Sequence, residues 1–144
     1  MAAIETGSIT DTARAFFDAL DTGQGWEACS AFCLPDATFA AQAEPLAEIQ
    51  TLAEYAEWMK GMMSVLPDGR YDMKSFAIDA ERQTVVGYAV FHGTHTGEGG
   101  PVPPTGKAAS SDYVYVMEFE GDKIRGLTKI WNAGWALRQL GWAD

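Results

Sequence analysis

The sequence predicts an α+β fold, because its helical and strand-like patterns are segregated along the chain and do not alternate. In the first 66 residues, apolar positions recur mainly at helical spacing. From residue 71 to residue 132, strand-like runs are separated by short turns. The 144 residues contain no repeat and no linker, so we expect a single domain over residues 1–144.

Three helices are expected before the strands. The first follows a capping-box pattern at residues 8–11, and the third has the clearest apolar period of 3.6. The short second helix places Cys29 and Cys33 on one face, most simply as small core residues, with a redox or metal role as the alternative. The expected ranges are about 8–21, 26–34 and 51–66.

The strands that follow form a meander in which each run leads into the next. A short strand is also expected earlier, over residues 37–41. Gly121-Asp122 has the composition of a hairpin turn between the last two runs. The expected ranges are about 71–79, 84–96, 107–120 and 123–132.

Alternation predicts which side chains of the last strands face the helices. Tyr113, Tyr115 and Met117 share the inner face, while Val114 and Val116 lie on the outer face, where they suggest a subunit contact. In the final strand, continued alternation predicts that Lys123, Arg125 and Lys129 point outward and that Ile124, Thr128, Ile130 and Asn132 point inward. An inward Asn is either bonded to backbone or directed at a ligand.

The charge balance limits the classes of partner. Ten Lys and Arg face twenty Asp and Glu, which gives a formal net charge of −10. Such a surface repels phosphate backbones and anionic lipid, so we expect neither a nucleic-acid nor a membrane role. No apolar run is long enough to span a bilayer and no signal-peptide pattern is present, so a cytoplasmic location is expected.

The stretch from His92 to Lys107 carries two motifs that suggest binding sites. On a strand, His92 and His95 point to opposite faces, so they cannot hold one metal ion together. The simplest role for them is that of hydrogen-bonded strand histidines, and the alternative is that one of the two acts as an acid or base. The glycine- and proline-rich loop has the wrong spacing for a phosphate-binding loop and lacks its Ser or Thr.

Several segments together resemble the SnoaL-like polyketide cyclases, of the ester cyclase type, in the nuclear transport factor 2-like superfamily. The resemblance covers essentially the whole chain and is most specific from residue 92 to residue 141. It rests on the helices and on Gly93-Thr-His-Thr-Gly-Glu98, Pro104-Thr-Gly-Lys107, Gly121-Asp-Lys-Ile124 and Leu137-Arg-Gln-Leu-Gly141.

The resemblance implies a cone-shaped α+β barrel, in which three N-terminal helices wrap a curved mixed sheet around an apolar pocket. It also implies a homodimer through the sheet, a hydrophobic small-molecule partner, and no metal or cofactor. In these cyclases an acidic residue in the pocket acts as the base for an intramolecular aldol closure.

The chain departs from that pattern where the last strand ends. The family typically has acids in a segment resembling His-Trp-Asp-x-x-Asp, whereas this chain has Trp131-Asn132, and no Asp or Glu occurs between Asp122 and Asp144. A replacement base is then His95 or Asp36, although Asp36 also suits a structural role in a turn.

These observations give a candidate site and three alternative functions. His95, Asp36 and Asn132 are the candidate catalytic residues of a cofactor-independent cyclase or isomerase that acts on a hydrophobic carbonyl compound. The alternatives are a non-catalytic small-molecule binding protein on the same fold, and an interaction module that uses the outer sheet face. The candidate substrate-binding residues are Tyr113, Tyr115, Met117, Tyr55, Met59 and Trp131.

Overall fold

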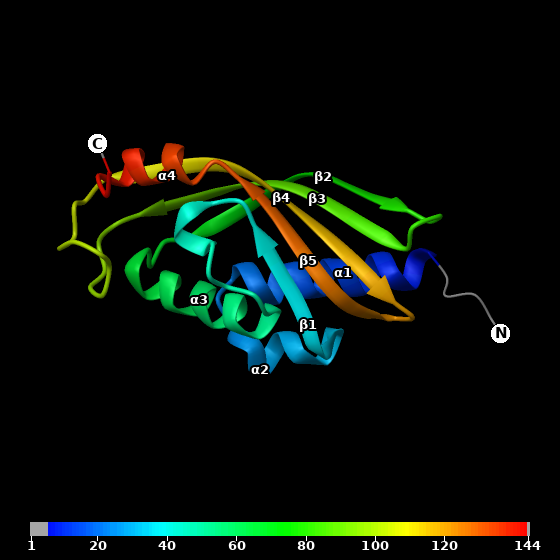
Figure 1. Ribbon diagram of the computed structural model, residues 1–144. Coiled ribbons are helices and arrows are strands. Elements are labelled where there is room, and N and C mark those ends of the chain that lie inside the picture. The colour runs from blue at the N-terminus through cyan, green and yellow to red at the C-terminus, as the bar shows by residue number, and fades with distance from the viewer. Residues whose placement is uncertain (1–5, 144) are drawn as a thin grey trace.

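Four α-helices and a five-stranded sheet make up residues 6–143, the part of the chain described by this computed structural model (Figure 1). The α+β class predicted from the sequence is confirmed. The helices are α1 (Thr6–Asp21), α2 (Gly25–Cys29), α3 (Leu52–Val65) and α4 (Ala133–Leu140). The strands are β1 (Cys33–Ala41), β2 (Arg70–Asp79), β3 (Thr84–Thr94), β4 (Ala108–Glu120) and β5 (Lys123–Trp131).

The sheet is mixed, curved and open. Its strand order is β1-β5-β4-β3-β2, in which β1 runs parallel to β5 and the other neighbours are antiparallel. Register shifts interrupt the β1–β5, β2–β3 and β4–β5 pairings, and such irregularities bend strands. The expected curved mixed sheet is therefore confirmed, but β1 and β2 lie at opposite edges and do not close a barrel.

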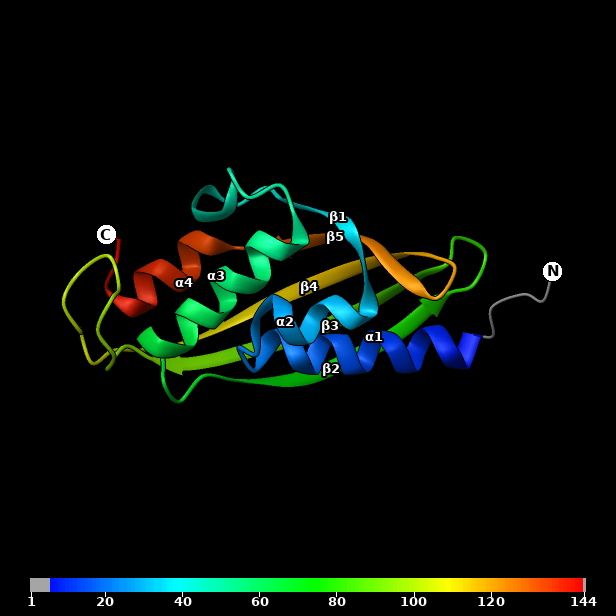
Figure 2. The ribbon, with the colours of Figure 1, turned by 90° about the horizontal axis from the view of Figure 1, so that it is seen from below.

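The first three helices cover one face of the sheet, here called the inner face (Figure 2). Aromatic packing joins the helices to this face. The ring of Phe17 on α1 lies 4.8 Å from that of Tyr115 and 6.1 Å from that of Tyr113, centroid to centroid. Tyr113, Tyr115 and Met117 are all buried, as the alternation in β4 predicted. None of the described helices is both long and apolar enough to cross a membrane.

Two helix boundaries differ from those predicted. Helix α2 ends at Cys29, and after a short 3-10 turn Cys33 already begins β1. Pro35 explains this early strand, because a proline restricts the residue before it to extended backbone. Both cysteines are buried and free, and burial raises the pKa of each thiol to about 12. Helix α1 begins at Thr6, so Ser8 lies within it and is not its N-cap.

The loop between β3 and β4 is hydrogen-bonded to the C-terminal end of α3. The amide of Gly97 donates to the carbonyl of Val65 over 3.0 Å, and backbone bonds between His95 and the pair Gly106 and Lys107 close the base of the loop. A β-carbon at residue 97 would lie only 1.9 Å from the carbonyl oxygen of Ser64. Only glycine therefore fits this contact without moving the loop or the helix.

Replacing Gly97 with Ala should lower the free energy of unfolding by about 1–3 kcal/mol, because the backbone must shift to relieve the overlap. The matched control is Gly61→Ala in α3, where an added β-carbon meets nothing within 4 Å. That change should raise the free energy of unfolding by up to about 1 kcal/mol, since Ala is the better helix former. Urea denaturation of both variants measures the difference, and equal stabilities would contradict this account of the loop.

Candidate functional site

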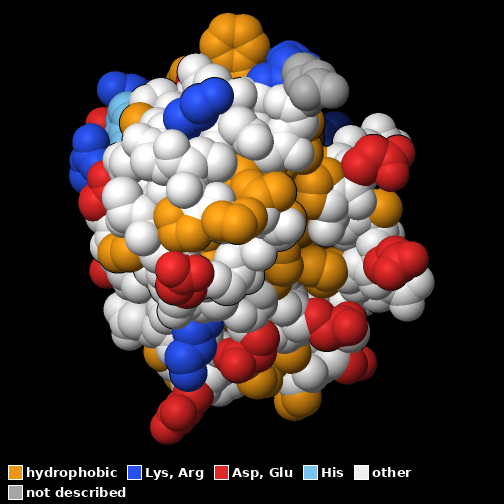
Figure 3. All heavy atoms as spheres, turned by 90° about the vertical axis from the view of Figure 1, so that its left-hand side faces the viewer, with side chains coloured by type: hydrophobic (Ala, Val, Ile, Leu, Met, Phe, Trp, Pro, Cys, Tyr) orange, Lys and Arg blue, Asp and Glu red, His pale blue; other side chains and the backbone are white. Residues whose placement is uncertain are grey.

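A cavity of about 610 Å³ lies between the helices and the inner face of the sheet. It extends from the end of α1, past α3 and β3–β5, to the loop at residues 99–101, α4 and Trp142. Figure 3 views the end of the molecule that contains the loop, with hydrophobic side chains across its middle and acidic side chains at its lower and right-hand edges. Most of the residues that line the cavity are apolar, as in sites for small organic ligands.

Asp21, the last residue of α1, places a buried carboxyl group at the inner end of this cavity. Its side chain continues the apolar face that includes Phe17, and only 1% of the residue is exposed. The hydroxyl of Tyr115 donates to Oδ1 over 2.7 Å, and the hydroxyl of Tyr113 donates to Oδ2. Burial raises the pKa of Asp21 to about 6, although the two tyrosine hydrogen bonds and the charge of Lys129 act in the opposite direction.

A chain of hydrogen bonds links Asp21 to Lys129. The hydroxyl oxygens of Tyr115 and Tyr55 lie 2.6 Å apart, and Lys129 Nζ donates to the Tyr55 hydroxyl over 2.9 Å. Each phenol has a single proton. When Asp21 is ionised, Tyr115 donates to it and must therefore accept from Tyr55, which accepts from Lys129. This order, Lys129–Tyr55–Tyr115–Asp21, is here called the relay.

The amine of Lys129 is surrounded by aromatic rings and faces the cavity. Its Nζ lies 4.1 Å from the ring centroid of Trp131 and between 5.3 and 5.9 Å from those of Tyr55, Trp58, Tyr113 and Tyr115. Cation–π attraction thus partly replaces lost hydration. Burial still lowers the pKa of Lys129 to about 8, although the negative charge of Asp21 opposes the change.

The prediction that Lys129 points outward is wrong, and a bulge in β5 explains why. The pairing of β4 with β5 shifts register between Glu118 and Phe119, opposite the segment from Ile124 to Gly126. One extra residue reverses the alternation that follows it. Leu127 and Lys129 therefore face inward, whereas Ile130 is 60% exposed, contrary to its predicted inward orientation.

The structure brings together most of the predicted substrate-binding residues. Tyr113, Tyr115, Met59 and Trp131 line the cavity. Tyr55 is fully buried behind them and contributes its hydroxyl to the relay. Met117 and Tyr55 lie outside the lining and belong to the hydrophobic core. Whether these residues bind a substrate stays a prediction.

Asn132 does not point inward as predicted. It is exposed and precedes α4, where its Oδ1 accepts a hydrogen bond from the Trp135 amide over 3.1 Å. It is thus the N-cap of a helix that the sequence analysis did not predict. The cap residue, the following apolar spacing and Gly141, which has a left-handed φ of 79°, were the available signals.

The two candidate bases, His95 and Asp36, lie outside the cavity lining. Asp36 is exposed on β1. His95 is fully buried beside the lining, where its Nδ1 accepts hydrogen bonds from Trp142 Nε1 at 2.8 Å and from the Thr105 amide at 3.3 Å. Its Nε2 has no hydrogen-bond partner among the described residues. The buried acid of the cavity is Asp21, which the sequence analysis treated only as the end of a helix.

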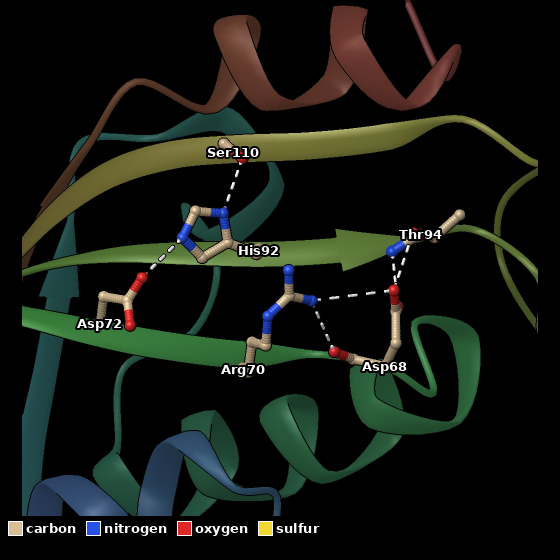
Figure 4. A network of polar contacts seen from close by, with 6 residues as sticks. All are labelled: Asp68, Arg70, Asp72, His92, Thr94 and Ser110. Carbon is tan, nitrogen blue, oxygen red and sulfur yellow. Dashed lines mark hydrogen bonds and ion pairs between the residues drawn. The ribbon is translucent and has the colours of Figure 1, made fainter.

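His92 lies in a separate polar network on the outer face of the sheet (Figure 4). Its ring spans three strands, with Nδ1 2.7 Å from Ser110 Oγ on β4 and Nε2 3.1 Å from Asp72 Oδ2 on β2. Next to it, Asp68 accepts hydrogen bonds from the amide and hydroxyl of Thr94. The two histidines therefore have entirely different partners. Residues 6–143 contain no group of three or more potential side-chain ligands placed to hold a metal ion.

Comparison with known proteins gives a family match and related folds. The sequence matches the SnoaL-like polyketide cyclase family over residues 10–140. No curated protein matches it significantly. Many solved structures do, and the identities of the three described next, all under 25%, make them relatives in fold alone.

Three of these structures illustrate the likeness. A proposed SnoaL-like polyketide cyclase from Jannaschia sp. CCS1 has a TM-score of 0.79 at 14% identity, with 100% of this chain and 98% of that one covered. AclR, a proposed hydroxylase from Streptomyces galilaeus, gives 0.78 at 19%, covering 97% and 89%. IdmH, a proposed polyketide cyclase from Streptomyces antibioticus, gives 0.72 at 22%, covering 92% and 98%.

Proposed function

Because the chain belongs to the SnoaL-like polyketide cyclase family, we propose that it is a cyclase- or isomerase-type enzyme that needs no cofactor. Its substrate is a hydrophobic carbonyl compound bound in the cavity. Asp21 removes a proton from the carbon next to the carbonyl group. The observation that carries the proposal is the buried Asp21 carboxyl, whose pKa of about 6 suits a base at neutral pH.

The neighbouring groups supply what this chemistry needs. Loss of the carbon-bound proton moves negative charge onto the carbonyl oxygen. Once Asp21 holds that proton, the hydroxyl of Tyr113 no longer faces a carboxylate and can turn to donate to the oxygen. The ammonium of Lys129 adds a positive charge at the same wall of the cavity. The lining holds two carboxylates, Asp21 and Glu57, against the single amine of Lys129, and this balance favours an uncharged substrate over an anionic one.

Two expectations from the sequence remain proposals, namely a non-catalytic binding protein and a homodimer that forms through the sheet. A non-catalytic binding protein would need the same apolar cavity but no titratable group in it, so the buried Asp21 favours an enzyme. A homodimer through the sheet would use the outer face of β4, where Val114 and Val116 are half-buried and Ile130 on β5 is exposed.

The test is deuterium exchange at an acidic carbon. An apolar aryl ketone with exchangeable hydrogens beside its carbonyl is incubated with the protein in heavy water and followed by NMR. Asp21→Asn should slow the protein-catalysed exchange by about 10²–10⁴-fold, the usual contribution of a general base. The wild-type rate should also fall below pH 6, since protonated Asp21 cannot accept a proton.

Matched variants separate the alternatives. Asp11→Asn removes an exposed carboxylate from the same helix and should leave the exchange rate unchanged. Asp36→Asn and His95→Gln test the other candidate bases. A loss of exchange in either of these, with full activity in Asp21→Asn, would overturn the assignment. Binding of the ketone without any exchange by the wild-type protein would favour the binding protein.

A further inference from the structure

The amine of Lys129 is placed as a nucleophile as well as a charge. Among the described residues, its only hydrogen bond is the one donated to the Tyr55 hydroxyl. It forms no ion pair within 4.0 Å with any carboxylate of residues 6–143. Its other neighbours are aromatic rings, and it is the only lysine or arginine that lines the cavity in the described part of the chain.

We propose that Lys129 condenses with the carbonyl carbon of the bound substrate to form an imine, so that the substrates are apolar ketones or aldehydes held covalently during the reaction. Desolvated lysines in apolar pockets act as nucleophiles toward carbonyl compounds. The inference rests on the proposed function in one respect, namely that the ligand of the cavity carries a carbonyl group.

The relay provides the neutral amine that this step requires. Lys129 passes a proton to the Tyr55 oxygen, Tyr55 passes its own to Tyr115, and Tyr115 passes its own to Asp21. The result is a neutral amine and a neutral acid, without bulk water in the cavity. Burial lowers the pKa of Lys129 and raises that of Asp21, and so brings the neutral pair closer in free energy to the charged pair.

Imine formation by the neutral amine releases water as its only by-product. The nitrogen lone pair attacks the carbonyl carbon, and the electron pair of the broken C=O π bond takes a proton that Asp21 returns. The nitrogen then gives up one of its two protons through Asp21 to the hydroxyl, and the carbinolamine loses that hydroxyl as water while the nitrogen lone pair forms the C=N bond. A protonated imine withdraws electrons from the neighbouring C–H bond, and the regenerated Asp21 carboxylate removes that proton to give an enamine. The same two residues thus serve both steps.

The experiment traps the imine in the wild-type protein. A naphthaldehyde is added with sodium cyanoborohydride, which reduces an imine to a stable amine, and the modified peptide is identified by mass spectrometry. The expected result is one preferred adduct at Lys129, absent from Lys129→Met and unchanged in the control Lys74→Met, which alters an exposed lysine of β2. Tyr55→Phe should slow labelling about tenfold, because it breaks the relay at its second member.

Binding of the same aldehyde without reductant, followed by fluorescence quenching, separates the possible failures. Binding in the cavity with no adduct at Lys129 would overturn the imine and leave the proposed function standing. No binding at all would contradict the proposed function as well. Adducts spread evenly over surface lysines would also overturn the imine. The wild-type map decides the question even if Lys129→Met fails to fold.

Discussion

Replacing Lys129 with Met is expected to lower the free energy of unfolding by about 1–2 kcal/mol at neutral pH, because Asp21 loses its countercharge and, with a pKa already near 6, takes up a proton. Met keeps most of the volume of the lysine stem, so the loss reports mainly on charge. Asp21→Asn should cost a similar amount, since it leaves the Lys129 ammonium in the same position.

The double variant Asp21→Asn/Lys129→Met should be more stable than the sum of the two single changes predicts, because it leaves no buried charge unpaired. Denaturant unfolding of all four proteins gives the coupling energy. The two charges are joined through Tyr55 and Tyr115 and are not in direct contact. Strict additivity would mean that they do not interact through this chain.

The pKa shifts of Asp21 and Lys129 predict how the contribution of each group to stability changes with pH. The pKa of Asp21 is raised from 3.8 to about 6, so its contribution is fully present below pH 3.8 and is lost as the pH rises through about 6. Lys129, lowered from 10.5 to about 8, contributes fully above pH 10.5 and loses that contribution as the pH falls through about 8. Between pH 6 and 8 both groups are charged, and the burial cost of each charge is offset in part by the charge of the other.

Each single variant should therefore change the pH profile in its own direction. In Lys129→Met the pKa of Asp21 should rise above 6, because the lysine charge that lowers it is gone, and stability should fall toward alkaline pH. In Asp21→Asn the pKa of Lys129 should fall below 8, and stability should fall toward acid pH. Identical pH profiles for the two variants would contradict the assignment of these shifts to the pair.

Long, regular elements could be predicted from the sequence because their patterns are local. Helix α3 begins where Thr51 and Glu54 form a capping box, and its apolar period is unbroken. In β4, thirteen residues alternate without a bulge against β3, so the inner face was predicted correctly. The mixed sheet needed the family resemblance, since no local pattern indicates that β1 lies parallel to β5.

The roles of Asp21 and Lys129 in the site were not predicted, because they depend on features that local periodic patterns do not show. Asp21 follows Phe17 by four residues and so shares its face, but an acid at the end of a helix is usually solvated. Lys129 was assigned to the wrong face because Gly126, a residue typical of bulges, was counted as regular strand. A polar residue in phase with an apolar face, and a glycine within a strand, were the available signals.

The second large effect on stability is expected from a change at His95. Its hydrogen bonds connect the loop between β3 and β4 to the C-terminal segment, residues 140–143. His95→Phe keeps a ring of similar size but removes the acceptor of two hydrogen bonds, from Trp142 Nε1 and from the Thr105 amide. Thr105 in turn donates to the Leu140 carbonyl over 2.6 Å. Leaving two partly buried donors unpaired should lower the free energy of unfolding by about 2–4 kcal/mol.

Hydrogen exchange should locate this loss, because the partners of His95 lie on two segments that both line the cavity. Gly100 on the loop, and Leu140 and Trp142 after β5, belong to the lining, and Gly100 approaches the His95 ring so closely that an added β-carbon would lie 3.0 Å from Nε2. In His95→Phe, amides of residues 96–106 and 140–143 should exchange faster, while those of β4 should not change. Trp142→Phe, which removes one donor and leaves the histidine, should show a smaller effect in the same segments. If exchange rose evenly over the whole chain, or if stability did not change, His95 would not be the link between the loop and the C-terminal segment.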